Sequence, residues 1–233
     1  MQQYIHLDAR LSLAFDLFDP CDLAADIGTD HAHLPAALLQ RGRCQHMILT
    51  DISESALTNA RREILRFRLS DRVTLRTGDG LSPLQEVCKM ISVTGMGGRT
   101  IRNILLQGRE KLHGASLVLS AHTDLSLIRE AIRDIGYCPD REEPCFCAGR
   151  YYLVIRARPG SWNPTGRELR LGSVLFSSSS DHLLPYLSRQ RDVLCEKLRG
   201  LSAAGNPDPF LTRQLQEDIA FYEDYIPERM LKP

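Results

Sequence analysis

Residues 25–35, which read Ala-Asp-Ile-Gly-Thr-Asp-His-Ala-His-Leu-Pro, decide the fold. The apolar residues that lead into Asp26 predict a buried strand, and the chain then turns at Gly28 before a predicted helix over residues 32–41. Glycine lets the backbone approach a ligand closely, and the Asp26 carboxylate can accept hydrogen bonds at the strand end. The pattern predicts a nucleotide-binding turn, although many Asp-x-Gly sequences form tight turns without a ligand.

Three further predicted strands, over residues 46–50, 73–77 and 91–94, also end in polar or glycine turns. The carboxyl ends of parallel strands form the ligand crevice of an open α/β sheet, so we expect these turns to surround one ligand together with the first turn. The acid that follows the second strand lies at the offset where a carboxylate reaches ribose hydroxyls. The turn residues are Asp51 and Ile52, then Gly78, Asp79 and Gly80, then Gly95, Met96 and Gly97.

The dinucleotide fingerprint Gly-x-Gly-x-x-Gly is absent after the first predicted strand, where Thr29, Asp30 and His31 stand instead. The Asp30 carboxylate would repel the two phosphates that NAD places against such a helix. A nucleoside without phosphates therefore fits better. S-adenosylmethionine carries a sulfonium and an ammonium group, so an acid-lined pocket favours a methyltransferase over a dehydrogenase.

Composition and charge describe an ordinary globular chain. Its 233 residues allow one α/β domain with a smaller second unit, and 43% hydrophobic with 25% charged residues argues against disorder. Lys and Arg total 29, equal to Asp and Glu, so overall charge carries no nucleic-acid signal. No signal-peptide pattern or membrane-length apolar run is present, which predicts a cytoplasmic protein with no membrane partner.

The cysteine pattern argues against a metal site. The seven cysteines include no Cys-x-x-Cys pair, and Cys145 with Cys147 lacks a second pair or nearby histidine to complete a tetrahedral zinc site. We therefore expect buried, reduced thiols and no metal.

Alternating strands and helices predict a Rossmann-like α/β sheet of the class I methyltransferase type over residues 1–160. A fifth strand is expected at residues 116–120, and residues 137–158 suit a closing antiparallel hairpin. Ser53 and Ser126 are predicted to cap two of the helices. The predicted helices span residues 7–18, 32–41, 53–67, 99–111 and 126–135.

The pattern changes after the connector at residues 159–164. Two apolar stripes at helical spacing, one over residues 183–201 and one over 211–226, are separated by the breaker 205–209. They predict two antiparallel helices that pack on each other, so we place a C-terminal helical, coiled-coil domain at residues 161–233.

Together these motifs resemble the bacterial tRNA (adenine-22, ring nitrogen 1)-methyltransferases over nearly the whole chain. The resemblance implies a Rossmann-like catalytic domain, a C-terminal coiled-coil domain, S-adenosyl-L-methionine as methyl donor and tRNA as acceptor. It is carried by Arg10-Leu11, by residues 26–32 with Leu34-Pro35, by 78–81, by 95–98 and by 148–152.

Two departures from the family stand out. His33 occupies a position where the family usually has tyrosine, and the fifth predicted strand leads into Ser120-Ala121-His122 where Gln-Pro-Asn is typical. The polar edge after this strand faces the transferred methyl group in this fold class. The second departure therefore bears on how the acceptor base is positioned.

The class pattern assigns Asp26 and Asp30 to the methionine end of the donor, Asp51 to the ribose and Asp79 to the adenine amino group. Asp30 and His31 are alternatively expected to orient the acceptor base, and the carbonyls of Thr94 and Gly95 to stabilise positive charge on it. These four are the predicted catalytic residues. The predicted donor site is Asp26, Gly28, Asp30, His31, Asp51, Ile52, Gly78, Asp79, Gly80, Gly95, Met96 and Gly97.

Contacts with RNA phosphates are predicted for Arg10, Arg99 and Arg150, against the alternative of plain surface salt bridges. We expect a monomer. Two rival hypotheses stay open at this point: a methyltransferase of the same fold that acts on a small molecule or protein, and an RNA-binding relative without turnover. A third rival is a protein that binds a phosphate-bearing cofactor such as NAD.

Overall fold

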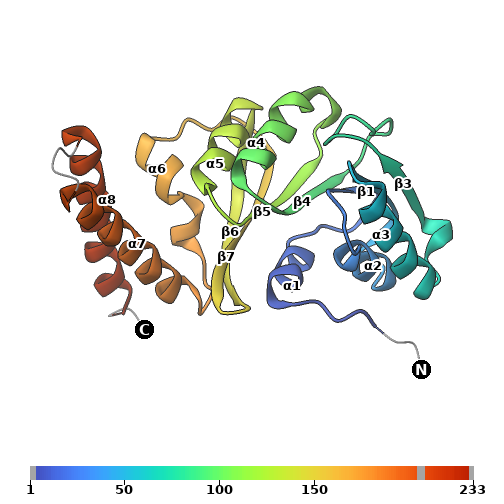
Figure 1. Ribbon diagram of the computed structural model, residues 1–233, viewed down its shortest axis with the longest axis horizontal. Helices are drawn as coiled ribbons and strands as arrows, with labels where there is room; N and C mark the ends of the chain where they lie inside the picture. The colour runs from blue at the N-terminus through green and yellow to red at the C-terminus, as the bar shows by residue number, and fades with distance from the viewer. Residues whose placement is uncertain (1–3, 204–207, 231–233) are drawn as a thin grey trace. The chain divides into compact units, whose positions relative to one another are not determined.

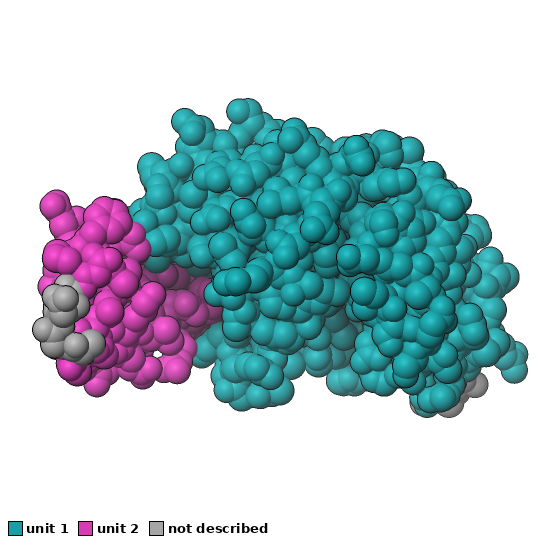
Figure 2. Space-filling model, turned by 45° about the horizontal axis from the view of Figure 1, so that its top comes forward, with its two compact units in different colours: residues 1–178 teal, residues 179–233 magenta. Residues whose placement is uncertain are grey.

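The computed structural model describes residues 4–203 and 208–230 and divides the chain into two compact units (Figures 1 and 2). Unit 1 comprises residues 1–178 and unit 2 comprises residues 179–233. Among the described residues, no helix is both long and apolar enough to cross a membrane.

Unit 1 is built on one seven-stranded sheet with the order β3-β2-β1-β4-β5-β7-β6. The first five strands are parallel, while β7 runs antiparallel to both β5 and β6. This order confirms the predicted Rossmann-like α/β sheet and its closing hairpin. The strands are β1 (Cys21–Ile27), β2 (Cys44–Asp51), β3 (Val73–Thr77), β4 (Met90–Met96), β5 (Ser116–Ala121), β6 (Tyr137–Cys147) and β7 (Arg150–Pro159).

Helices and short 3-10 turns connect the strands. Helices α2 and α3 lie along β2 and β3, while α4 and α5 contact each other beside β4 and β5 (Figure 1). The helices are α1 (Ala9–Asp16), α2 (His33–Gln40), α3 (Glu54–Arg66), α4 (Gly98–Gln107), α5 (Leu125–Asp134) and α6 (Gly166–Leu171), and the 3-10 turns are η1 (Ser70–Arg72), η2 (Arg109–Lys111) and η3 (Val174–Ser177).

The two predicted helix caps had different outcomes. Ser53 is the N-cap of α3, where its hydroxyl accepts a hydrogen bond from the Ala56 amide at 3.4 Å, as predicted. Ser126 was wrongly predicted as a cap, because α5 begins one residue earlier and its N-cap is Asp124. Asp124 adopts a left-handed conformation (φ 57°) and makes no side-chain capping bond. Its tolerance of that conformation determines where the helix begins.

The boundary between the units lies at residue 178 rather than at the expected residue 160. The intervening segment, residues 161–178, is bonded to a buried ion pair between α5 and β6, in which Nε of Arg129 donates to Oε1 of Glu142 at 2.6 Å. Arg129 also donates to the carbonyl of Arg170 at 3.1 Å, and the Leu175 amide donates to Glu142 at 2.9 Å. These bonds anchor α6 and η3 to unit 1, so the segment is not a free linker.

Unit 2 contains two long helices, α7 (Leu183–Ala203) and α8 (Pro209–Met230), which contact each other. The second predicted stripe is buried along α8 at Leu215, Ile219, Tyr222 and Ile226. The predicted breaker at 205–209 overlaps residues 204–207, which lie outside the described residues.

Candidate functional site

A cavity of about 290 Å³ opens at the carboxyl ends of β1 and β4. Its wall combines α1, the turn between β1 and α2, the turn after β4 and the residue after β5. The parallel strands end at one sheet edge, as the sequence predicted, and so bring these turns together. The predicted residues in its wall are Arg10, Asp26, Gly28, Asp30, His31, Thr94 and Gly95.

Asp26 is the buried acid of this cavity, with 6% of its surface exposed. One carboxylate oxygen accepts a hydrogen bond from the Ser92 hydroxyl at 2.5 Å, and the other accepts from the Thr29 hydroxyl. Burial raises the pKa of Asp26 from 3.8 to about 6, while these two hydrogen bonds and the charge of Arg10 partly oppose the rise. The carboxylate is thus ionised at neutral pH and supplies a negative charge where little solvent screens it.

This raised pKa predicts a change of stability with pH. The folded protein holds the Asp26 proton more tightly than the unfolded chain, so this contribution is fully present below pH 4 and lost as the pH rises through 6. The free energy of unfolding of the wild type should fall by roughly 2–2.5 kcal/mol relative to that of an Asp26→Asn variant between pH 4 and pH 7. Urea unfolding of both proteins across this range measures the difference, and a constant difference would contradict the raised pKa.

Gly28 forms the floor of the turn with a positive φ of 74°. A Cβ placed there would lie 1.7 Å from Cε of Met96, so the Met96 side chain occupies the space that the glycine leaves free. The Gly28 amide donates to the Thr50 carbonyl at 2.8 Å and ties the turn to the end of β2. Met96 therefore fills the side of Gly28 where a Cβ would stand, and the close approach of a ligand to this glycine stays a prediction.

Asp30 and His31 lie at the exposed rim of the cavity. Nε2 of His31 is 3.3 Å from a carboxylate oxygen of Asp30, and Asn59 donates to the other oxygen at 3.3 Å. The His31 ring stacks on His33 with 5.7 Å between centroids. Asp30 does not cap the next helix, because the N-cap of α2 is Ala32 in a left-handed conformation. Both side chains are more than half exposed at the rim, at 57% for His31 and 62% for Asp30.

Arg10 and His122, which line the cavity, belong to a cluster of polar and aromatic side chains that continues outside it through Tyr152 and Arg150. Nε2 of His122 lies 3.0 Å from the Gly95 carbonyl oxygen, and its ring meets Tyr152 edge-on at 5.8 Å. The guanidinium groups of Arg10 and Arg150 lie 5.6 and 5.4 Å from the Tyr152 ring centroid. The buried Nη1 of Arg10 has no hydrogen-bond partner among the described residues, so the cavity offers an unused donor to an anionic group.

The remaining predicted donor residues lie in adjacent turns outside this cavity wall. The Asp51 carboxylate accepts from the Ser53 amide at 2.7 Å, and its carbonyl accepts from the Gly78 amide at 3.0 Å. Asp79 and Gly80 line a separate hollow of about 210 Å³ beside α4, while Ile52 is 72% exposed. Met96 lies against Gly28 and does not itself line the cavity at the ends of β1 and β4, and Gly97 is the N-cap of α4. The exposed Arg99 and Arg150 lie outside both hollows.

Sequence reasoning did not assign Ser92, Thr29 or Tyr152 to the site. Ser92 carried a usable signal, since it is a buried hydroxyl among the apolar residues that begin β4. Tyr152 lies in the 148–152 motif that carries the resemblance, but its ring contacts with Arg10 and His122 join two other segments of the chain and could not be predicted from that motif.

The open parallel sheet and its acid-bearing turns define a Rossmann-like, nucleoside-binding class of protein. A family model described as a methyltransferase domain matches residues 7–155. The chain belongs to this methyltransferase family. Membership agrees with the charge argument at Asp30, which favoured methyl transfer over a dehydrogenase.

Individual relatives confirm the resemblance drawn from the sequence. The tRNA (adenine(22)-N(1))-methyltransferase of Bacillus subtilis (strain 168) is 29% identical over 192 residues, which cover 82% of this chain and 78% of that protein. The structure of the B. subtilis m1A22 tRNA methyltransferase TrmK matches with a TM-score of 0.84 and 23% identity, covering 95% of this chain and 99% of that chain. M. capricolum TrmK, solved with the cofactor product S-adenosyl-homocysteine, matches with a TM-score of 0.79 and 24% identity over 95% and 98% of the two chains. At these identities the solved structures support the fold.

Proposed function

We propose that this methyltransferase transfers a methyl group from S-adenosyl-L-methionine to ring nitrogen 1 of adenine 22 in tRNA. The observation that carries the proposal is the cavity at the ends of β1 and β4, where the buried acid Asp26 and the glycine turn at Gly28 lie together. The activity named for the B. subtilis relative and the product bound to M. capricolum TrmK support the acceptor and the donor.

Asp26 supplies the negative charge that holds the ammonium end of the donor, since its two oxygens keep lone pairs beyond those used by Ser92 and Thr29. Arg10 faces the same cavity with an unpaired buried nitrogen, so we assign it to the donor carboxylate in place of the RNA contact expected from the sequence. From the turns next to the cavity, Asp51 keeps its predicted role toward the ribose and Asp79 its predicted role toward the adenine amino group of the donor.

Adenine nitrogen 1 carries a lone pair and no proton, so the reaction needs no strong base. The donor supplies a methyl group on a positively charged sulfur, and in-line displacement leaves the base cationic. The site residues align the nucleophile and stabilise that growing charge. Backbone carbonyls of Thr94 and Gly95 are suited to this work, and a second lone pair on the Gly95 oxygen remains beside its contact with His122. Asp30 and His31 at the rim are placed to orient the base.

Nitrogen 1 lies on the pairing edge, so the target base must be unpaired or turned out before transfer. Its RNA surroundings must then be recognised outside the cavity. We assign this to the exposed Arg99 and Arg150 and to unit 2, whose paired helices we interpret as a coiled coil. We also propose that the enzyme acts as a cytoplasmic monomer.

The test is incubation of the full chain with methyl-labelled S-adenosylmethionine and unmodified tRNA, followed by digestion and identification of the labelled nucleoside. Label in 1-methyladenosine at position 22, lost when that adenine is replaced, is the expected result. Label in a small molecule or protein alone would support the rival hypothesis of a methyltransferase of the same fold that does not act on RNA. Donor and tRNA binding without transfer would support a non-catalytic protein, the reading motivated by Ser120-Ala121-His122.

A Gly28→Ala variant should separate donor binding from stability. Both Gly28→Ala and the control Gly42→Ala force alanine into a positive φ (74° and 67°), which should cost each about 1–2 kcal/mol of unfolding free energy. Only the first displaces Met96, because nothing lies within 4 Å of a Cβ at Gly42. Donor affinity should therefore fall by on the order of tenfold in Gly28→Ala alone. Equal donor affinities, measured by calorimetric titration, would contradict the assigned close approach.

A further inference from the structure

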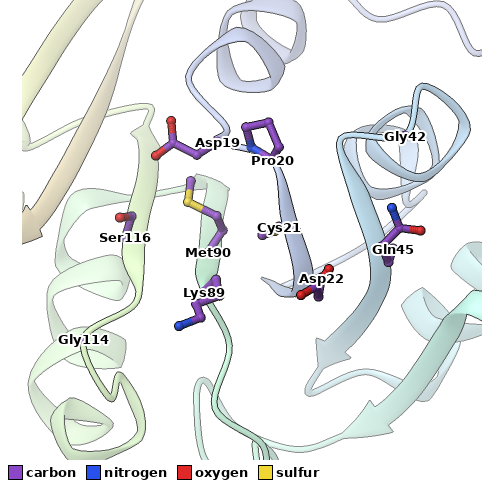
Figure 3. Close-up of a pocket in the computed structure, with 10 residues that line it drawn as sticks. All are labelled: Asp19, Pro20, Cys21, Asp22, Gly42, Gln45, Lys89, Met90, Gly114 and Ser116. Atoms are coloured by element: carbon purple, nitrogen blue, oxygen red, sulfur yellow. The ribbon is translucent and has the colours of Figure 1, made fainter.

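A second hollow, of about 550 Å³, lies at the opposite edge of the sheet from the candidate active site. Its wall is formed where the parallel strands β1, β2, β4 and β5 begin (Figure 3). The catalytic cavity lies where β1 and β4 end, so the two openings are on different sides of the sheet. Cys21, Asp22, Gln45, Lys89 and Ser116 are among the lining residues.

Cys21 lies in the wall of this hollow next to a second thiol. Cys21 and Cys44 are register partners at the first positions of the adjacent parallel strands β1 and β2. Adjacent strands lie about 4.8 Å apart, within the Cα separation that a disulfide accepts. The two sulfur atoms are 3.7 Å apart, and a bond requires an approach to about 2.05 Å. Side-chain rotation can supply this movement while the strand pairing is kept.

The surroundings of the pair make the two thiols unequal. Cys21 donates a hydrogen bond to Cys44, which lowers the pKa of the Cys44 thiol and raises that of Cys21. The charge of Arg72 also lowers the pKa of Cys44, and its guanidinium donates to the Cys44 carbonyl at 2.6 Å. Cys44 is completely buried, whereas Cys21 is partly exposed to the hollow. A small oxidant can thus reach the pair from the Cys21 side.

We propose that Cys21 and Cys44 form an oxidisable dithiol, a modification site at which a peroxide entering through this hollow converts the two thiols into an intramolecular disulfide. The geometry of the pair and its access from solvent carry the proposal, which does not depend on the methyl-transfer reaction.

The chemistry needs one peroxide molecule as oxidant. The Cys21 sulfur, which faces the hollow, attacks a peroxide oxygen as its thiol proton leaves, the O–O bond breaks, and a sulfenic acid forms on Cys21 with release of one water. The Cys44 sulfur then attacks the oxidised sulfur, its proton leaves with the hydroxyl group as a second water, and the S–S bond forms. Two thiols are oxidised by two electrons, and the peroxide is reduced.

The test exposes the full-length native protein to a modest excess of hydrogen peroxide, blocks remaining thiols by alkylation and maps the peptides by mass spectrometry. We expect a Cys21–Cys44 linked species that is lighter than the two free peptides by about 2 Da, two hydrogen atoms, and that dithiothreitol reverses. The other five cysteines should remain alkylatable after unfolding.

Cys21→Ser should abolish the linked species. Cys147→Ser is the matched control, because Cys147 is also partly exposed but does not line this hollow. Mapping the wild-type protein needs no variant, so instability of a Cys44 substitution does not affect the test. A Cys21 that stays reduced, or that reaches only the sulfinic acid without crosslinking, would overturn the proposal. Neither outcome bears on methyl transfer, which the labelled-tRNA assay measures separately.

Discussion

Asp26→Asn is expected to weaken binding of S-adenosylmethionine about 100-fold, equivalent to about 2.7 kcal/mol. The substitution keeps the size of the side chain but removes the negative charge that we place against the donor ammonium. Little solvent reaches the site, since only 6% of the Asp26 surface is exposed, so water cannot replace the lost attraction. The Ser92 and Thr29 hydroxyls can turn to meet the new amide, which limits the structural change.

Calorimetric titration of the donor into both proteins measures this loss, and circular dichroism checks that the fold is kept. Asp22→Asn is the matched control, because Asp22 lies on the same strand but is exposed at the opposite edge of the sheet. It should bind the donor like wild type. If Asp26→Asn bound the donor within threefold of wild type, Asp26 would be a structural acid that only organises the turn.

Arg129→Met is expected to lower the free energy of unfolding by about 3–5 kcal/mol. The Arg129 and Glu142 side chains are 1% and 0% exposed, and their 2.6 Å ion pair lies between α5 and β6. Removal of the cation leaves the Glu142 carboxylate buried, with the Leu175 amide as its remaining partner among the described residues. An uncompensated buried charge is far more costly than a lost surface contact. The end of unit 1, around α6 and η3, should loosen first.

Urea unfolding of three proteins tests this expectation. Arg213→Met removes the cation of an exposed pair with Glu217, at 81% and 47% side-chain exposure, and should change stability by at most about 0.5 kcal/mol. Adding Glu142→Leu to Arg129→Met removes the unpaired charge and should restore much of the loss. A loss in Arg129→Met as small as that in Arg213→Met would show that the buried pair does not anchor the segment.

Local signals in the sequence were enough to predict most of the architecture. Apolar runs that stop at glycine and acidic turns marked the parallel strands, and Ser53 marked the start of α3 as it was predicted to do. Ser126 failed as a cap because the N-cap of α5 is the left-handed Asp124, two residues earlier. The predicted helix over residues 99–111 is interrupted at Gly108, where any Cβ would lie 2.5 Å from that of Leu81. Both corrections depend on backbone geometry and packing that residue spacing does not encode.

Local patterns were sufficient to predict the fold class and the turns after β1 and β4 that line the cavity, because strand and helix periods and turn chemistry are properties of neighbouring residues. The predicted turns at Asp51 and Asp79 lie outside that cavity. Tertiary contacts were needed to show that the Ser92 hydroxyl donates to Asp26, and that Arg10 lines the cavity with its guanidinium over the Tyr152 ring. It also decided that the first unit continues to residue 178. These features depend on contacts between segments far apart in the chain, and on burial, which sets the pKa of Asp26 and the cost of every unpaired charge.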